Sequence, residues 1–329
     1  MSRVLNRDRC HNDIIDNRYL PIDIFRGCAI LGMIFFTVTL RLSDTLPDVL
    51  RHNAWGAVHL GDFILPFFLF ASGLSLAFYV EKNHHLERIV LIKTVGMRFA
   101  FLASIGLALS FFSANGLFAM DEVMLSALLF LGCVVLYRVH WMVNVVIIFV
   151  INCSYLVLMS YDLTSIFIGH YLGGYPAALY YFPIMLTGVL IGQGVVMDQL
   201  WSNRTLAIIG SIGGYFLIFS LGIPLNKLEA APSFMMLAIL FSCLVFFGLV
   251  LLDLPARSVR GLARIGRTPL RYWVLMYVLV LIPLSLYIRS AALSFPLSLS
   301  WGWAVGISLV VMGVLYLSSS VFEYIAISK

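Results

Sequence analysis

Two histidines and a carboxylate lie close together between two long apolar runs. His52, His59 and Asp62 fall within the stretch Arg51–Asp62. His59 and Asp62 are three residues apart and would share one face of a helix, where a carboxylate orients an imidazole and raises its basicity. Such an imidazole can take a proton from an attacking amine or hydroxyl. The alternative is that these polar residues satisfy one another at a helix end.

A second group lies at the start of the first apolar run, in the sequence Asp23-Ile24-Phe25-Arg26-Gly27. Asp23 and Arg26 are three residues apart, so their side chains could pair on one helix face. This spacing is also typical of a capping pair at a helix start. In the functional interpretation, Arg26 faces an anionic ligand that enters from the cytoplasm.

A third group is a basic segment before the ninth apolar run, with Arg257, Arg260, Arg264, Arg267 and Arg271. Guanidinium groups match the geometry of phosphate oxygens, so the segment could hold the phosphates of a cytoplasmic cofactor. Basic residues of this kind also mark the cytoplasmic side of a membrane protein. From these residues alone, a basic inner face and an outer histidine suggest a route between a cytoplasmic anion and an extracytoplasmic reaction.

The elements that must position these residues are membrane-spanning helices. The chain is 61% hydrophobic and 11% charged, whereas a soluble domain has roughly 25% charged residues. Its apolar runs are mostly unbroken for about 17–22 residues, which is the length of a spanning helix and not the alternating pattern of a β-barrel. We count ten: Ile24–Leu40, Leu60–Val80, Phe99–Ser113, Val123–Tyr137, Trp141–Met159, Phe182–Val196, Leu206–Leu221, Phe234–Leu252, Leu270–Tyr287 and Trp301–Ser320.

The basic residues set the expected orientation. With ten spans and the N-terminus inside, 17 of the 21 Lys and Arg residues lie in inner segments, and only Arg41, Arg51, Lys227 and Arg289 lie outside. Because inner loops are enriched in Lys and Arg, we expect both ends of the chain in the cytoplasm. The sequence thus predicts an all-α polytopic bundle that forms one domain over residues 1–329, with residues 1–23 as a cytoplasmic segment. The net charge of +5 reflects this topology and does not indicate nucleic-acid binding. The five cysteines show no paired spacing, and no metal site is expected.

Four segments near the N-terminus resemble the catalytic domain of heparan-α-glucosaminide N-acetyltransferase and its prokaryotic relatives. The family pattern is an Asp-x-Phe-Arg-Gly helix start, an outer His-x-x-Trp, and an Asp-x-x-x-Pro-x-Phe-x-Phe-x-x-Gly segment. The matching segments are Pro21–Gly27 (PIDIFRG), Leu31–Phe35 (LGMIF), His52–Trp55 (HNAW) and Asp62–Gly73 (DFILPFFLFASG). A weaker similarity lies at Gly266–Tyr272 (GRTPLRY).

The resemblance implies a membrane acyltransferase. That family moves an acetyl group from cytoplasmic acetyl-CoA to an amino sugar across the membrane. His52 stands at the position of its catalytic loop histidine, where it would act as general base or accept the acetyl group covalently; His59 and Asp62 are the other candidate catalytic residues. Candidate donor-binding residues are Asp23, Arg26, Arg98, Arg267 and Arg271. The expected partners are membrane lipids, the CoA thioester, a sugar or lipid-linked acceptor and, in a homodimer, a second copy. The expected location is the plasma (inner) membrane of a prokaryote.

The chain departs from the family pattern at three places. Thr37 replaces an asparagine, Met276 replaces a histidine, and Met124–Leu128 replaces a segment with a Gln-Arg pair. A hydroxyl acceptor, a lipid-linked sugar or a different acyl group is compatible with these changes. Two other functions remain open at this point: a multi-span transporter or flippase, and a non-catalytic relative of the family.

Overall fold

The computed structural model of the chain describes residues 19–51, 58–83, 87–112, 121–161, 163–164, 174–227, 229–252, 254–290 and 299–327. Within these ranges the chain is helical and contains no strand. The membrane-type helical bundle expected from the apolar runs is therefore confirmed.

The described part of the chain is built almost entirely of helices. Their bounds are α2 Leu20–Leu42, η1 Asp48–Leu50, α3 Leu60–Lys82, α4 Arg88–Phe112, α5 Glu122–Leu136, α6 Trp141–Ser160, α7 Gly174–Val196, α8 Asn203–Ser220, α9 Pro232–Leu252, α10 Ala256–Arg267, α11 Pro269–Met276, η4 Tyr277–Leu281, α12 Ile282–Ser290 and α13 Trp301–Ile327. The segment η4 is a π-helical turn, so α11, η4 and α12 form one interrupted rod.

Each of the ten expected spans coincides with a helix or, for the ninth, with this interrupted rod. In the described residues, seven helical stretches are long and apolar enough to cross a membrane: α2, α3, α6, α7, α9, the rod from Pro269 to Tyr287, and α13 up to Ser318. The helix α5 is apolar but shorter. Ten crossings and cytoplasmic termini stay predictions. Several helices extend beyond the apolar runs; α4 begins at Arg88 and not near Phe99.

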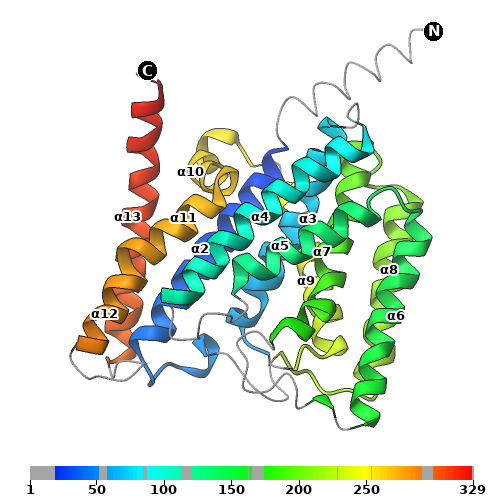
Figure 1. The fold of residues 1–329 in the computed structure, drawn as a ribbon, viewed down its shortest axis with the longest axis horizontal. Coiled ribbons are helices and arrows are strands. Elements are labelled where there is room, and N and C mark those ends of the chain that lie inside the picture. The colour runs from blue at the N-terminus through cyan, green and yellow to red at the C-terminus, as the bar shows by residue number, and fades with distance from the viewer. Residues whose placement is uncertain are drawn as a thin grey trace.

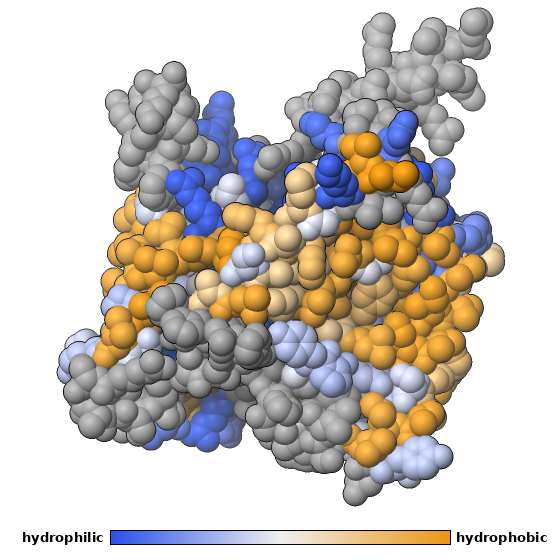
Figure 2. Space-filling view, in the orientation of Figure 1, coloured by the Kyte–Doolittle hydropathy of each residue, from blue (hydrophilic) through white to orange (hydrophobic). Residues whose placement is uncertain are grey.

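The bundle has a buried centre and an apolar belt. The start of α2 and the end of α13 lie on the same face of the bundle, which we call the inner face (Figure 1). Apolar side chains cover the middle of the side in view, between more polar ends (Figure 2). Of the spanning windows, that of α7 is 89% buried and that of α13 only 17%. Thus α7 is enclosed by other helices, whereas α13 offers most of its surface to lipid.

Glycines let the two central helices approach each other closely. A Cβ at Gly73 of α3 would overlap the Met185 carbonyl oxygen of α7, and a Cβ at Gly188 of α7 would overlap the Phe70 carbonyl oxygen of α3. Small residues at a crossing bring helix backbones together, and packing of this kind drives association where lipid replaces water. The α3–α7 pair therefore fixes the wall against which the other helices of the site are placed.

Replacing Gly188 by valine should destabilise the protein by at least about 1–3 kcal/mol, because the side chain has no space and the helices must separate. The measurement is thermal unfolding of the purified protein in detergent. Gly210→Val on α8 is the matched control, since a Cβ there meets no atom within 4 Å. Equal melting temperatures for the two variants would contradict the close crossing.

Candidate functional site

A cavity of about 710 Å³ opens between the central helices. Its walls come from α2, α3, α4, α5, α7, the end of α10 and the start of α11. Along α3 the lining residues extend from Lys82 at the inner face to Phe68. This separation of 14 residues corresponds to about 21 Å of helix. The cavity therefore extends from the inner face well into the depth expected for the membrane.

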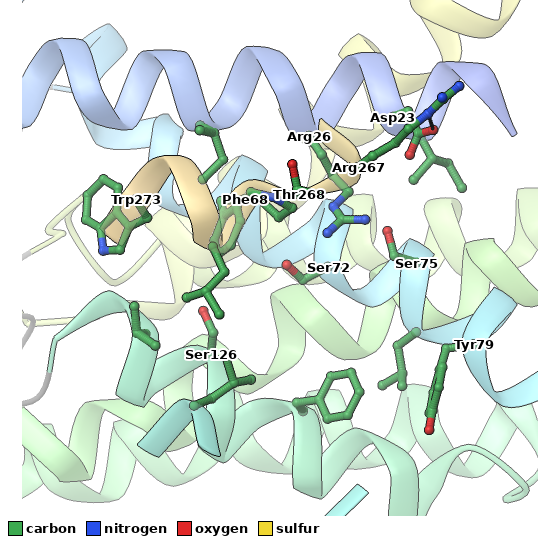
Figure 3. A pocket seen from close by; sticks show the side chains of 18 of the residues that line it. Asp23, Arg26, Phe68, Ser72, Ser75, Tyr79, Ser126, Arg267, Thr268 and Trp273 are labelled. Atoms are coloured by element: carbon green, nitrogen blue, oxygen red, sulfur yellow. Dashed lines mark hydrogen bonds and ion pairs between the residues drawn. The ribbon is translucent and has the colours of Figure 1, made fainter. Parts of the chain in front are cut away.

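All five residues predicted to bind the donor line this one cavity: Asp23, Arg26, Arg98, Arg267 and Arg271. Asp23 Oδ2 lies 3.1 Å from Arg267 Nε, and the Asp23 side chain is 7% exposed. The guanidinium carbon of Arg98 lies 4.0 Å from the centre of the Tyr79 ring, a cation–π contact. The end of the cavity that holds Asp23 and Arg267, near the inner face, is called the mouth here (Figure 3). The cavity as a whole is lined by four arginines and Lys82 against the two carboxyl groups of Asp23 and Glu122. This excess of positive charge favours a polyanion.

The mouth depends on packing between segments distant in sequence. Asp23 forms an ion pair with Arg267, which lies 244 residues further along the chain, a partner that the (i, i+3) spacing to Arg26 does not indicate. A Cβ at Gly266 would overlap the Asp23 carbonyl oxygen, and a Cβ at Gly27 would overlap that of Leu262. The absence of side chains at Gly27 and Gly266 lets α10 lie directly on α2. This contact places Arg267 beside Asp23.

The middle of the cavity is less charged. It is lined by Phe68, Ser72 and Ser75 of α3 and by Ser126 of α5 (Figure 3). The hydroxyls of Ser75 and Ser126 donate to carbonyl oxygens of their own helices, at 2.8 and 2.7 Å. Hydroxyl oxygens can still accept hydrogen bonds in this arrangement. The section can thus hold a chain that is mainly apolar with a few polar groups.

Glu122 and Trp273 line the end of the cavity near Ser126. Trp273 lies at the opposite end of the cavity from Asp23 and Arg267 (Figure 3). Glu122 begins α5 and is 6% exposed, and Trp273 on α11 is 2% exposed. Next to Glu122, Asp121 caps α5 by accepting the Met124 N–H at 2.7 Å, and its burial raises the pKa of that carboxyl to about 7.

The predicted catalytic residues are His52, His59 and Asp62, and the structure describes the last two. His52 lies outside the described residues. Asp62 is 1% exposed, and its Oδ1 lies 3.2 Å from Nζ of Lys227, in the connection between α8 and α9. Its Oδ2 accepts the backbone N–H of His59 at 3.0 Å. The His59 ring nitrogen Nδ1 lies 3.1 Å from the Arg51 carbonyl oxygen. Asp62 thus caps the start of α3 and pairs with Lys227, where the spacing had suggested that it orients the His59 ring.

Lys227 is a partner of Asp62 that the sequence did not single out. Its side chain is 11% exposed. Burial lowers the pKa of Lys227, and the neighbouring Asp62 carboxylate offsets part of that decrease. In the sequence, Lys227 stands out only as one of four basic residues in segments expected outside. A lone lysine in a short polar connection carries no signal of burial.

No sequence pattern singled out Glu122, Trp273 or the three serines that line the cavity. A glutamate at the start of an apolar run is typical of the first turn of a helix. Serines within spanning helices usually donate hydrogen bonds to carbonyl groups of their own helix. The tryptophan directly follows Gly266–Tyr272, the segment whose similarity to the family is weaker. These residues line one cavity only because the helices pack together in this arrangement.

Residues 18–219 of the chain match a known protein family. A family model, heparan-alpha-glucosaminide N-acetyltransferase, catalytic, matches residues 18–219. This range covers α2 to α8 and excludes α10, α11 and Lys227. A search of curated proteins gave no match.

Proposed function

The chain belongs to the heparan-alpha-glucosaminide N-acetyltransferase family, and from this premise we propose that it is a membrane acyltransferase with a cytoplasmic CoA thioester as donor. It would move an acetyl or other acyl group from acetyl-CoA to an amino sugar, or to another glycan or lipid-linked acceptor, on the extracytoplasmic side. The membrane is proposed to be the plasma membrane of a prokaryote.

The cavity is the observation that carries this proposal. Arg26, Arg98, Arg267 and Arg271 all line it, although they come from three separate parts of the chain. Guanidinium groups form paired hydrogen bonds with phosphate oxygens. The apolar and hydroxyl-bearing middle section suits the pantetheine arm, which has amides on an otherwise apolar chain. The phosphates would therefore stay at the inner face while the thioester extends towards Glu122 and Trp273.

The proposed chemistry is attack of the acceptor on the thioester carbon. His52 would take a proton from the acceptor amine or hydroxyl as it attacks. Alternatively, His52 would first accept the acyl group itself. His59 remains a second candidate base. Asp62, bound to Lys227 and to the His59 backbone, would hold the start of α3 in place.

Arg26→Gln should weaken acetyl-CoA binding by roughly 10- to 100-fold, because a hydrogen bond to a charged group contributes about 1.5–3 kcal/mol. Turnover at saturating donor should change less. The measurement is calorimetric titration of the purified protein with acetyl-CoA, with ATP as a second ligand. Arg260→Gln on α10 is the matched control, because Arg260 is exposed and does not line the cavity.

If Arg26→Gln and Arg260→Gln bind the donor as tightly as the unaltered chain, the phosphates do not bind at this mouth. If folded protein binds no CoA compound, the acyltransferase proposal fails. A transporter, or a relative without catalytic activity, would then be the better interpretation.

A further inference from the structure

The helix α10 carries more arginines than the cavity uses. They are spaced by three, four and three residues, at Arg257, Arg260, Arg264 and Arg267. With 3.6 residues per turn, this spacing places all four within an arc of about 80° on the helix surface. Of these four, Arg267 alone lines the cavity. The donor site therefore does not account for the arginines in the first half of α10.

The other side of α10 is apolar and packed on α2. Val259 is 7% exposed and Ala263 is 2% exposed, and both belong to one apolar cluster with Ile24 of α2. Because this side is fixed against the bundle, the arginine side is turned away from it. Arg257 and Arg260 are accordingly exposed. Correct orientation in the membrane requires basic residues on the inner side, but it does not require them to share one side of a helix.

Both neighbours of α10 place it at the edge of the membrane. The helix α9 ends on Leu251 and Leu252, which are 71% and 65% exposed, shortly before α10 begins. On α13, Tyr316 packs so closely that a Cβ at Gly261 of α10 would overlap its hydroxyl group. Tyr316 lies near the end of the stretch of α13 that can span a membrane, and tyrosines gather at the membrane–water interface. The arginines of α10 thus lie at the level of lipid headgroups.

Figure 1 shows α10 near the inner face, between α2 and α13, and the surface there is hydrophilic next to the apolar belt (Figure 2). Guanidinium groups form paired hydrogen bonds with phosphate oxygens. A helix with an apolar side and a basic side, held in the plane of the interface, is attracted to anionic lipids. Within the described ranges, neither Arg257 nor Arg260 has a carboxylate partner that would compete with a lipid phosphate.

We propose that the outward side of α10, through Arg257 and Arg260, binds the phosphate of an anionic phospholipid of the inner leaflet, of the phosphatidylglycerol type. The acyl chains of this lipid would lie on the exposed side chains of Leu251 and Leu252 at the end of α9. The site is distinct from the donor cavity, and it does not depend on the proposed acyltransferase function.

The test compares two short-chain lipids that share their acyl chains and phosphate and differ in net charge: dioctanoyl-phosphatidylglycerol and dioctanoyl-phosphatidylcholine. Each is titrated by calorimetry into the full-length protein, freed of lipid in a neutral detergent. The unaltered chain should bind the anionic lipid roughly 10- to 30-fold more tightly, since each basic residue near an anionic headgroup contributes about a fivefold preference. Arg257→Gln/Arg260→Gln should bind the two lipids about equally.

The matched control is Lys93→Gln/Arg138→Gln, which removes the same charge at two exposed residues, on α4 and in the connection between α5 and α6. This variant should keep the preference for the anionic lipid. A third ligand, glycerol 3-phosphate, carries a phosphate without acyl chains and should bind far more weakly than the lipid.

Equal binding of the two lipids by the unaltered chain overturns the inference, as does a preference that survives in Arg257→Gln/Arg260→Gln. Equal loss in the control variant would assign the effect to the general charge of the inner face and would also overturn it. Glycerol 3-phosphate binding as tightly as the lipid would replace the lipid site by one for soluble phosphates. If the double variant does not fold, the single variants decide: each should lower the preference about fivefold, and no loss in either contradicts the site. None of these outcomes affects the acetyl-CoA titration that tests the proposed function.

Discussion

His52→Ala should lower the rate of acyl transfer by about 10²- to 10⁴-fold, the usual contribution of a general base. The measurement is release of the CoA thiol from acetyl-CoA in the presence of a panel of amino sugars. Donor binding should be unaffected, because the arginines that we propose to bind the phosphates lie on other parts of the chain. The loss should therefore appear in kcat and not in the Kd for acetyl-CoA.

The matched control is His140→Ala. His140 is exposed at the start of α6, where its Nδ1 accepts the Met142 N–H at 3.4 Å. A rate for His52→Ala equal to that of His140→Ala would refute a catalytic role for His52. A trapped acetyl group on the unaltered chain, absent from His52→Ala, would favour covalent transfer over direct attack.

Lys227→Met should destabilise the fold by roughly 3–5 kcal/mol, because it leaves the buried Asp62 carboxylate without its counter-ion. Nζ of Lys227 lies 3.2 Å from Asp62 Oδ1, with exposed fractions of 11% and 1%. The measurement is thermal unfolding of the purified protein. The effect should be accompanied by lower activity, since the same carboxylate fixes the start of α3 through the His59 N–H.

The double variant Lys227→Met/Asp62→Asn separates the charge from the packing. It should recover part of the stability, because a neutral amide costs less to bury than an unpaired carboxylate. Lys93→Met on α4 is the control at an exposed lysine. If Lys227→Met melts at the same temperature as Lys93→Met, the Asp62–Lys227 pair does not contribute to stability.

The identity of the helices followed from local properties of the sequence. In lipid no water is present to bond the backbone N–H and C=O groups of an unbroken apolar run. A helix solves this because each of these groups bonds within its own segment. This is why the run Leu60–Val80 predicted α3 closely, and why the run Phe182–Val196 predicted the end of α7, although α7 begins earlier, at Gly174. The ends were less well predicted, as for α4, because a helix can continue beyond its apolar run into solvent.

Two contacts show what local pattern does not contain. Most of the basic segment before the ninth run forms the helix α10, which packs on α2. Asp23 forms an ion pair with Arg267 of that helix. In both cases the deciding contact is made across about 240 residues, and no spacing rule within one helix reports it.

The sequence by itself determined the all-helical membrane bundle, the family and the basic character of the inner mouth, because hydropathy, charge and short motifs are properties of neighbouring residues. Only the tertiary structure decided that Asp23, Arg26, Arg98, Arg267 and Arg271 line a single cavity and that Lys227 is a partner of Asp62. These facts depend on which helix faces meet. That choice is made by close packing, such as the glycine contacts between α2 and α10, and not by the composition of either helix alone.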